Sequence, residues 1–342
     1  MLRRIFIAAF CVFLAYPSQA AKETVLKIAS LAPDSTIWMQ EFRDSAEQIK
    51  EATQGRVKIK FYPGGVMGTD QAVLRKIRIG QLHGGAVTVG ALAKVYPDVQ
   101  IYSMPLQFRS VAEVNYVRKQ MDQLIRDNLR KHGFELLGMS NGGFAYFAGI
   151  QAGRSIDDFK KQRVWLPQGD LIGEAIFDAA GVSPVPLPLS DVYTSLQTGM
   201  LDTIVSNPSG IIAFQWHSKI RYLTDVPVVF LMGTIVVNSR AFNRIAETDQ
   251  DIVREEMQSM FLRLDKLNDQ DNANAYEALK KNGVEMISVS DEELKRWDQI
   301  ALDSLQQLAE QGAYSKDFLE LLQKHIKDFR DQNNKAAALV DQ

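Results

Sequence analysis

The amino-acid sequence predicts an α/β protein of two domains. Short runs of β-forming residues alternate with longer amphipathic stretches, which is typical of sheets covered by helices. About 320 residues remain once the first 20 are set aside, and this length exceeds what one hydrophobic core usually serves. Residues 249–282 contain neither Pro nor Gly, and one helix of this length would be about 50 Å long. We therefore expect this helix to cross both domains.

The first elements follow from local patterns. The run Val25–Ser30 predicts a strand, and either Asp34 or Ser35 is expected to cap the helix that follows, whose apolar residues recur at helical spacing. Gly55 is expected to end that helix. The alternation of apolar and polar residues over 57–65 predicts a second strand that leads into a Pro-Gly turn.

The same alternation continues through the first half of the chain. Residues 70–79 predict a second helix, and residues 84–90 a buried strand. A long helix is expected over 112–131, before a strand over 134–140. Repeated β-α order of this kind predicts a largely parallel sheet with helices on both faces.

The pattern then starts again in the second half. No linker rich in Gly, Ser and Pro separates the halves, so we expect strands to pass between the domains. The predicted strands are 145–150, 163–166, 203–207 and 233–238, and the predicted helices are 171–180 and 191–198.

The N-terminus has the layout of a secretory signal peptide. Arg3 and Arg4 precede an apolar run, Ile5–Ala15, and Pro17 follows it. The small residues of Ser18–Ala20 predict cleavage near Ala20, which defines residues 1–20 as the signal peptide. The apolar run is too short to span a membrane, which takes about 20 residues.

Removal of this segment would also remove Cys11, the one cysteine of the sequence. A mature chain without thiols has no disulfide, thiolate nucleophile or zinc–thiolate site, and suits the bacterial periplasm. It would carry 37 basic and 41 acidic residues, a formal net charge of −4. This mild, well-mixed charge argues against a nucleic-acid partner. We expect a freely soluble periplasmic protein that is a monomer.

No catalytic or metal-binding signature stands out. The sequence lacks the GxSxG nucleophile motif and both glycine-rich phosphate-binding motifs, and no cofactor is expected. Its histidines lie too far apart to form a HxxxH or HxxE pair: His83, His132, His217 and His325. A two-domain cleft that binds a ligand without changing it is therefore favoured over an enzyme.

Four segments, at 55–68, 73–85, 96–110 and 181–208, form an ordered set with distinctive spacing. Together they resemble the substrate-binding proteins of tripartite ATP-independent periplasmic (TRAP) transporters, of the DctP type. The likeness covers nearly the whole mature chain, and the most specific segment is "GVSPVPLPLSDVYTSLQTGMLDTIVSNP" at 181–208. The other three are "GRVKIKFYPGGVMG" (55–68), "VLRKIRIGQLHGG" (73–85) and "YPDVQIYSMPLQFRS" (96–110).

The resemblance implies a two-lobed periplasmic binding protein fold, type II-like, with a mixed sheet flanked by helices in each lobe. It implies an organic acid ligand and delivery to a membrane permease of a large and a small subunit. We expect one lobe to comprise residues 23–142 and 233–265, and the other to comprise residues 143–232 and 266–342, including the C-terminal helices.

One position departs from the family pattern. Most members carry an arginine that forks onto the ligand carboxylate, and here Trp165 stands in its place. Arg163 lies two residues earlier, on the same strand face and displaced by about 6.6–6.8 Å. A solvated basic strand end is favoured for Arg163 over direct ligand contact. For Trp165 we favour a pocket wall over a core position. The aromatic surface would then replace an ionic clamp, and the ligand is expected to have an apolar or aromatic part.

Further candidates would line the same cleft. Trp38, Phe144 and Trp216 could add rings, although Phe144 and Trp216 fit a core equally well. Asn141 and Asn207 follow strand-like runs and could hydrogen-bond the ligand, with Ser206 as the alternative to Asn207. Backbone N–H groups at Gly142–Gly143, or at the helix start near Gly169, could hold a carboxylate.

Two other functions remain open from the sequence. One is an exported small-molecule hydrolase or lyase on a two-lobed scaffold, and the other is a sensory ligand-binding partner of a membrane kinase.

Overall fold

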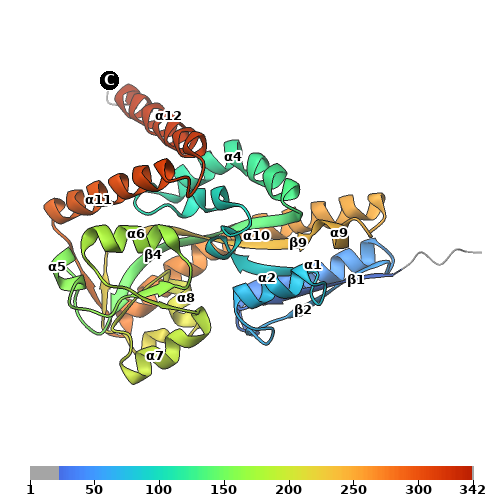
Figure 1. The fold of residues 1–342 in the computed structure, drawn as a ribbon, viewed down its shortest axis with the longest axis horizontal. Coiled ribbons are helices and arrows are strands. Elements are labelled where there is room, and N and C mark those ends of the chain that lie inside the picture. Colours follow the sequence, from blue (N-terminus) through green and yellow to red (C-terminus); the bar gives the residue numbers. More distant parts are fainter. Residues whose placement is uncertain (1–22, 341–342) are drawn as a thin grey trace, which may run out of the picture.

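The computed structural model describes residues 23–340, and their side chains up to residue 335, as two lobes lying side by side (Figure 1). The predicted signal peptide at residues 1–20 lies outside this range. No helix within the described residues has both the length and the apolar character that a membrane span requires. Within these residues, eight strands form one mixed sheet flanked by helices, which confirms the predicted α/β class.

The first lobe is built on three parallel strands, in which β1 (Thr24–Ser30) is hydrogen-bonded between β2 (Val57–Tyr62) and β3 (Gly84–Thr88). The predicted cap of its first helix is wrong: Thr36 has the extended backbone of a cap and accepts a hydrogen bond from the Met39 N–H, whereas Asp34 pairs with Arg43. The elements of this lobe are β1 (Thr24–Ser30), α1 (Ile37–Ala52), β2 (Val57–Tyr62), α2 (Asp70–Arg78), β3 (Gly84–Thr88) and α3 (Val89–Leu92).

Two long antiparallel strands, β4 (Phe134–Gly149) and β9 (Val229–Asn238), form the centre of the sheet. The first part of β4 pairs with β9, and its last four residues pair with strands of the second lobe. The sequence predicted two separate strands here and a largely parallel sheet, and both predictions are wrong. The strand continues because a bulge between Asn141 and Gly143, where Gly143 has φ +93°, absorbs the irregularity without ending the pairing.

The second lobe carries shorter strands. The strands β5 (Trp165–Pro167) and β6 (Val185–Leu187) pair in parallel. A bridge between Val164 and Thr203 joins them to β7 (Thr203–Ser206), which pairs with β4. The elements are α5 (Ile156–Phe159), β5 (Trp165–Pro167), α6 (Leu171–Ala180), β6 (Val185–Leu187), η2 (Leu189–Asp191), α7 (Val192–Thr198), β7 (Thr203–Ser206), α8 (Pro208–Ala213), η3 (Trp216–Ser218), β8 (Tyr222–Thr224) and β10 (Glu285–Ile287).

A single helix, α10 (Glu247–Lys281), runs along both lobes (Figure 1). It follows the short α9 (Ser239–Phe242) and packs against α1 of the first lobe, α8 of the second and β4 between them. The helix predicted over residues 249–282 is therefore confirmed, and so is its contact with both lobes.

The two C-terminal helices pack on different parts of the molecule. α11 (Asp291–Glu310) lies on α6, whereas α12 (Lys316–Val340) packs against α4 (Val111–Lys131) and η1 (Pro97–Ser103). The predicted lobe boundaries remain a proposal with one change: because α4 and η1 belong to the part assigned to the first lobe, we propose that α12 belongs there too.

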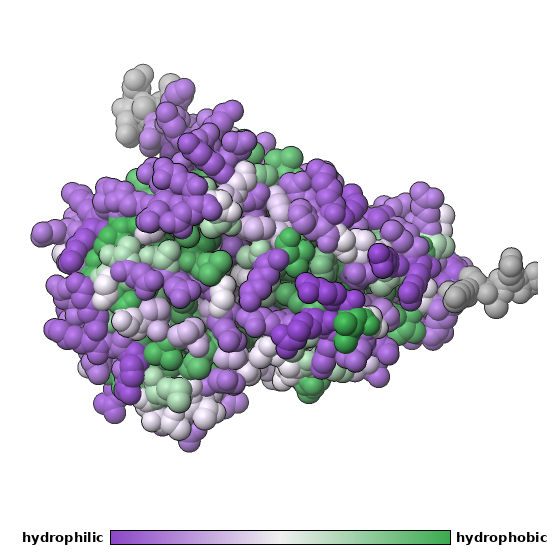
Figure 2. Space-filling view, viewed as in Figure 1, coloured by the Kyte–Doolittle hydropathy of each residue, from purple (hydrophilic) through white to green (hydrophobic). Residues whose placement is uncertain are grey.

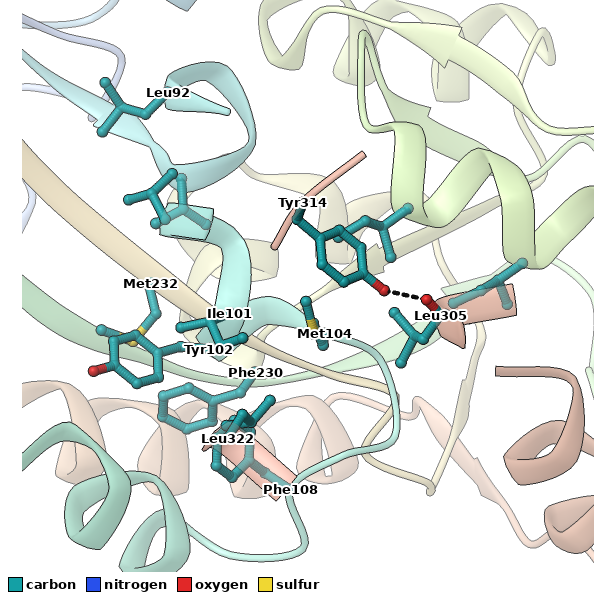
Figure 3. Close-up of a cluster of buried hydrophobic side chains, with 14 of the residues drawn as sticks. Leu92, Ile101, Tyr102, Met104, Phe108, Phe230, Met232, Leu305, Tyr314 and Leu322 are labelled. Atoms are coloured by element: carbon teal, nitrogen blue, oxygen red, sulfur yellow. Dashed lines mark hydrogen bonds between the residues drawn. The ribbon is translucent and has the colours of Figure 1, made fainter. Parts of the chain in front are cut away.

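Buried apolar residues form three clusters, one of which joins the C-terminal helices to the sheet (Figure 3). In that cluster the Tyr314 hydroxyl donates a hydrogen bond to the carbonyl of Leu305, and Leu322 packs near Phe108 and Phe230. Hydrophilic side chains cover most of the face in Figure 2, and apolar residues reach it in separate patches.

Candidate functional site

A cavity of about 430 Å³ lies between the lobes. The first lobe contributes the carboxyl ends of β1 and β3 and the start of α2, while the second contributes the segment from β5 into α6. Such a position, beyond the carboxyl ends of parallel strands, is where α/β proteins commonly bind ligands. The central strands and α10 form the floor, because Gly142, Leu231 and Asn268 all line the cavity.

Aromatic and aliphatic side chains make up most of the cavity wall. Rings come from both lobes and from the helices behind them, so an enclosed ligand would meet apolar surface on several sides. The aromatic residues that line it are Trp38, Phe42, Phe147, Trp165, Phe177, Phe214, Phe261 and Trp297.

Trp165 lines the cavity and is also built into the core of the second lobe. Its side chain is buried, with 4% of its surface exposed. Its Nε1–H donates to the carbonyl of Leu187 on the neighbouring strand β6 at 3.0 Å. Its ring packs edge-on against Trp216, with ring centroids 5.6 Å apart. Trp165 is therefore both a cavity wall and a core residue, and these two interpretations of the sequence are not exclusive.

Arg163 is placed away from the cavity, in an ion pair with Asp202. Its Nε and Nη2 atoms donate to the two carboxylate oxygens at 2.8 and 2.6 Å, and its backbone N–H adds a third bond at 2.9 Å. These hydrogen bonds lower the pKa of Asp202 below its ordinary value. The Nε/Nη2 edge of the guanidinium, which could fork onto a ligand carboxylate, is thus already used within the protein.

We expect Arg163→Gln to lower the melting temperature at pH 7 while changing ligand affinity by no more than about twofold. Because the pKa of Asp202 is lower in the folded than in the unfolded chain, the pair stabilises the fold above the unfolded pKa near 3.8. This stabilisation is lost as the pH falls through the lower folded value. Melting curves between pH 2 and 7 should therefore converge for the two proteins at the acid end.

A tenfold loss of ligand affinity in a folded Arg163→Gln protein would contradict this structural role. Such a loss would indicate that Arg163 contacts the ligand directly.

Two of the proposed aromatic residues do not line the cavity within the described part of the chain. Phe144 packs edge-on against Phe230, with ring centroids 5.0 Å apart. Trp216 is buried between Trp165 and Phe214, and its ring is 5.1 Å from that of Phe214. Trp216 therefore supports the cavity wall from behind.

Of the three polar residues proposed as ligand contacts, only one lines the cavity. Asn207 lines the cavity, and its Nδ2 donates to the carbonyl of Gly142 at 2.6 Å. Of the described residues that line the cavity, none is Asn141 or Ser206. Asn141 accepts a hydrogen bond from Arg118 and donates one to Asn115, so its side chain serves the strand instead.

Asn268 and Asn272 on α10 form a polar stripe that the sequence analysis missed. Asn268 accepts the Trp38 Nε1–H at 2.6 Å and donates to Ser140 Oγ and the Asn141 carbonyl, both at 2.9 Å. Asn272 donates to the Gly142 carbonyl at 2.9 Å. The stripe thus connects the cavity wall to the bulge of β4. Two asparagines spaced four apart, and so on one face of the long predicted helix, were the available signal.

Two aspartates are the only ionisable residues among the described residues that line the cavity. Asp70 opens α2 and Asp170 caps α6, so they come from opposite lobes. Burial raises the pKa of both carboxyl groups, against the opposing effect of hydrogen bonds from Thr88 to Asp70 and from backbone N–H groups to Asp170. The helix start near Gly169, proposed as a carboxylate site, is already occupied by Asp170, which accepts the Gly173 N–H at 3.0 Å.

The lobes also touch at the exposed edge of the cavity. Gln71 of α2 donates a hydrogen bond from its side chain to the carbonyl of Gln168, which follows β5, at 3.2 Å. Both residues line the cavity, and the bond crosses the cleft. This contact holds the two lobes together across the edge.

The family described as bacterial extracellular solute-binding protein, family 7 (DctP), matches residues 28–311 of the chain. The chain belongs to this family. The C4-dicarboxylate-binding periplasmic protein DctP of Rhodobacter capsulatus is 21% identical over 296 residues, which is 85% of this chain and 88% of that protein. The sialic acid-binding periplasmic protein SiaP of Vibrio cholerae is 22% identical over 242 residues, 69% of this chain and 74% of that protein.

Solved structures show the same fold at low identity. The sugar acid binding protein DctPAm from Advenella mimigardefordensis, in complex with galactonate, has a TM-score of 0.83 at 18% identity and covers 90% of this chain and 99% of its own. A TRAP periplasmic solute binding protein from Desulfovibrio salexigens with bound orotic acid has a TM-score of 0.83 at 20% identity, with the same coverage. The two-lobed TRAP fold predicted from the resemblance is confirmed.

This family 7 protein differs from the implied family pattern where the ligand carboxylate is expected. Trp165 lines the cavity where the resemblance implies an arginine, and Arg163 forms an ion pair with Asp202. Members of the family are binding proteins. Within the described residues we find no group of three or more His, Cys, Asp or Glu side chains suited to hold a metal ion.

Proposed function

We propose that this chain is the solute receptor of a TRAP transporter, which binds an organic acid with a sizeable apolar or aromatic part and delivers it to a permease of two membrane subunits. The observation that carries the proposal is the ring-lined cavity between two lobes in a family 7 fold. Relatives whose names specify a ligand bind sialic acid, 2,3-diketo-L-gulonate or C4-dicarboxylates, and solved neighbours hold sugar acids such as galactonate, gulonate and glucuronate, or succinate or orotic acid.

We also propose that the receptor works in the periplasm after cleavage of residues 1–20, and that the lobes close around the ligand by bending between them. The bulge of β4 and the long helix α10 lie where such bending would occur. No observation on the described residues favours a hydrolase, a lyase or a kinase partner.

A thermal-shift screen of organic acids tests the proposal. A ligand at 100 times its dissociation constant adds about 2.7 kcal/mol to the stability of the folded protein, a shift that melting curves resolve easily. Native mass spectrometry of protein purified without refolding should then recover the same ligand unchanged. Conversion of that ligand by the purified protein would contradict the receptor and favour an enzyme.

A further inference from the structure

The charge of the cavity differs from what an enclosed acid group needs. Of the described residues that line it, none is Lys, Arg or His, and two are aspartates. A carboxylate taken into this cavity would leave water without gaining a cation, and it would face two further acidic side chains. Burial of an unpaired ion is costly in an apolar environment.

Both aspartates are fixed in place by the protein. Asp70 Oδ2 accepts hydrogen bonds from the backbone N–H of Thr88 at 3.2 Å and from its hydroxyl at 2.9 Å. Asp170 Oδ1 accepts the Gly173 N–H at 3.0 Å as the cap of α6. Neither carboxylate can turn away from an incoming ligand without losing these bonds.

The exposed edge of the cleft is different, because a cation reaches it there. Lys94 follows α3 in the first lobe, and its side chain is exposed. A Cβ atom placed on Gly169 of the second lobe would lie 3.7 Å from Lys94 Nζ, next to the Gln71–Gln168 hydrogen bond. An acid group at this edge would keep contact with water and lie near an ammonium group.

We propose that Asp70 and Asp170 exclude a carboxylate from the cavity, so that the ligand binds with an uncharged, apolar end enclosed and its acid group at the exposed edge. The proposal rests on the receptor function above and adds the orientation of the ligand and the two residues that set it. It predicts that monocarboxylates with an apolar body are preferred to diacids and sugar acids.

Four probes and two variants test this orientation by isothermal titration. The probes are 3-phenylpropanoate, its primary amide, 3-(4-carboxyphenyl)propanoate, which carries a second acid group at the far end of the ring, and galactonate. The variants are Asp70→Asn and Asp170→Asn, since asparagine keeps an acceptor oxygen and caps helices as well as aspartate does. Asp298→Asn, at an exposed position of α11, is the control for the change in net charge.

The wild-type protein should bind 3-phenylpropanoate and its amide with affinities within about tenfold of each other, and the diacid at least about tenfold more weakly. Each variant should gain about tenfold in affinity for the diacid, or about 1.4 kcal/mol, without a change for the amide. Asp298→Asn should bind all four probes as the wild type does.

Two results would overturn the inference. One is a wild-type protein that binds the diacid or galactonate more tightly than 3-phenylpropanoate, which leaves the receptor function intact. The other is an unchanged diacid affinity in both variants while their melting curves show a folded protein. A protein that binds none of the four probes contradicts the proposed ligand class together with the orientation.

Discussion

Replacing Trp165 with alanine is expected to lower the free energy of unfolding by about 3–5 kcal/mol, the usual cost of truncating a buried tryptophan. The indole is almost fully buried, packs against Trp216 and donates a hydrogen bond to Leu187. The same ring lines the cavity, so the variant should also bind ligand roughly ten- to a hundredfold more weakly. Chemical denaturation and titration of the ligand found by screening measure the two effects separately.

Trp216→Ala is the matched control for this prediction. Trp216 is as deeply buried and belongs to the same cluster, but it does not line the cavity in the described structure. Its loss should destabilise the fold to a similar extent and change ligand affinity much less. Equal losses of affinity in the two variants, at a temperature where both are folded, would show that Trp165 acts only through the core.

Asn268→Leu is expected to lower the free energy of unfolding by at least about 2 kcal/mol, because it removes a hydrogen-bond partner from each of three polar groups in or near the core, at a cost of about 1–3 kcal/mol each. The indole N–H of Trp38, the hydroxyl of Ser140 and the carbonyl of Asn141 all bond to this one amide. Since Trp38 lines the cavity and Asn141 begins the bulge of β4, the variant should also bind ligand more weakly.

Denaturation curves, together with titration of the ligand found by screening, check this prediction. Asn274→Leu provides the control, because Asn274 is exposed on the same helix and its substitution should leave both measurements close to the wild type. Unchanged stability in Asn268→Leu would contradict the role that we assign to the network.

The long helix and several strands could be predicted because the pattern that indicates each of them lies within its own residues. The helix over 249–282 needs only uninterrupted helix-forming residues, and β1 and β3 follow from short apolar runs. The continuity of β4 was missed because Gly142 and Gly143 read locally as a break, whereas pairing with the distant β9 keeps the strand extended. The antiparallel order of that pair depends on the same distant contact.

The site was predicted only in part, for a related reason. Trp38, Trp165 and Asn207 line the cavity, whereas Arg163 is drawn to Asp202, a partner 39 residues away that no local pattern identifies. Asp70 and Asp170 looked like ordinary residues at helix starts, and only the closing of the two lobes places both of them on one cavity. Asn268 is linked to Trp38 across 230 positions of sequence.

The pairing of β4 with β9 also bears on how the chain acquires its structure. Phe134 of β4 faces Asn238 of β9, and the continuation of β4 completes the sheet of the second lobe. More than two thirds of the chain must therefore be synthesised before the central pair of strands can form. Contacts between residues so distant in sequence slow folding. Because the lobes share this strand, neither should survive as an excised fragment. A calorimeter should record one cooperative transition for the whole molecule.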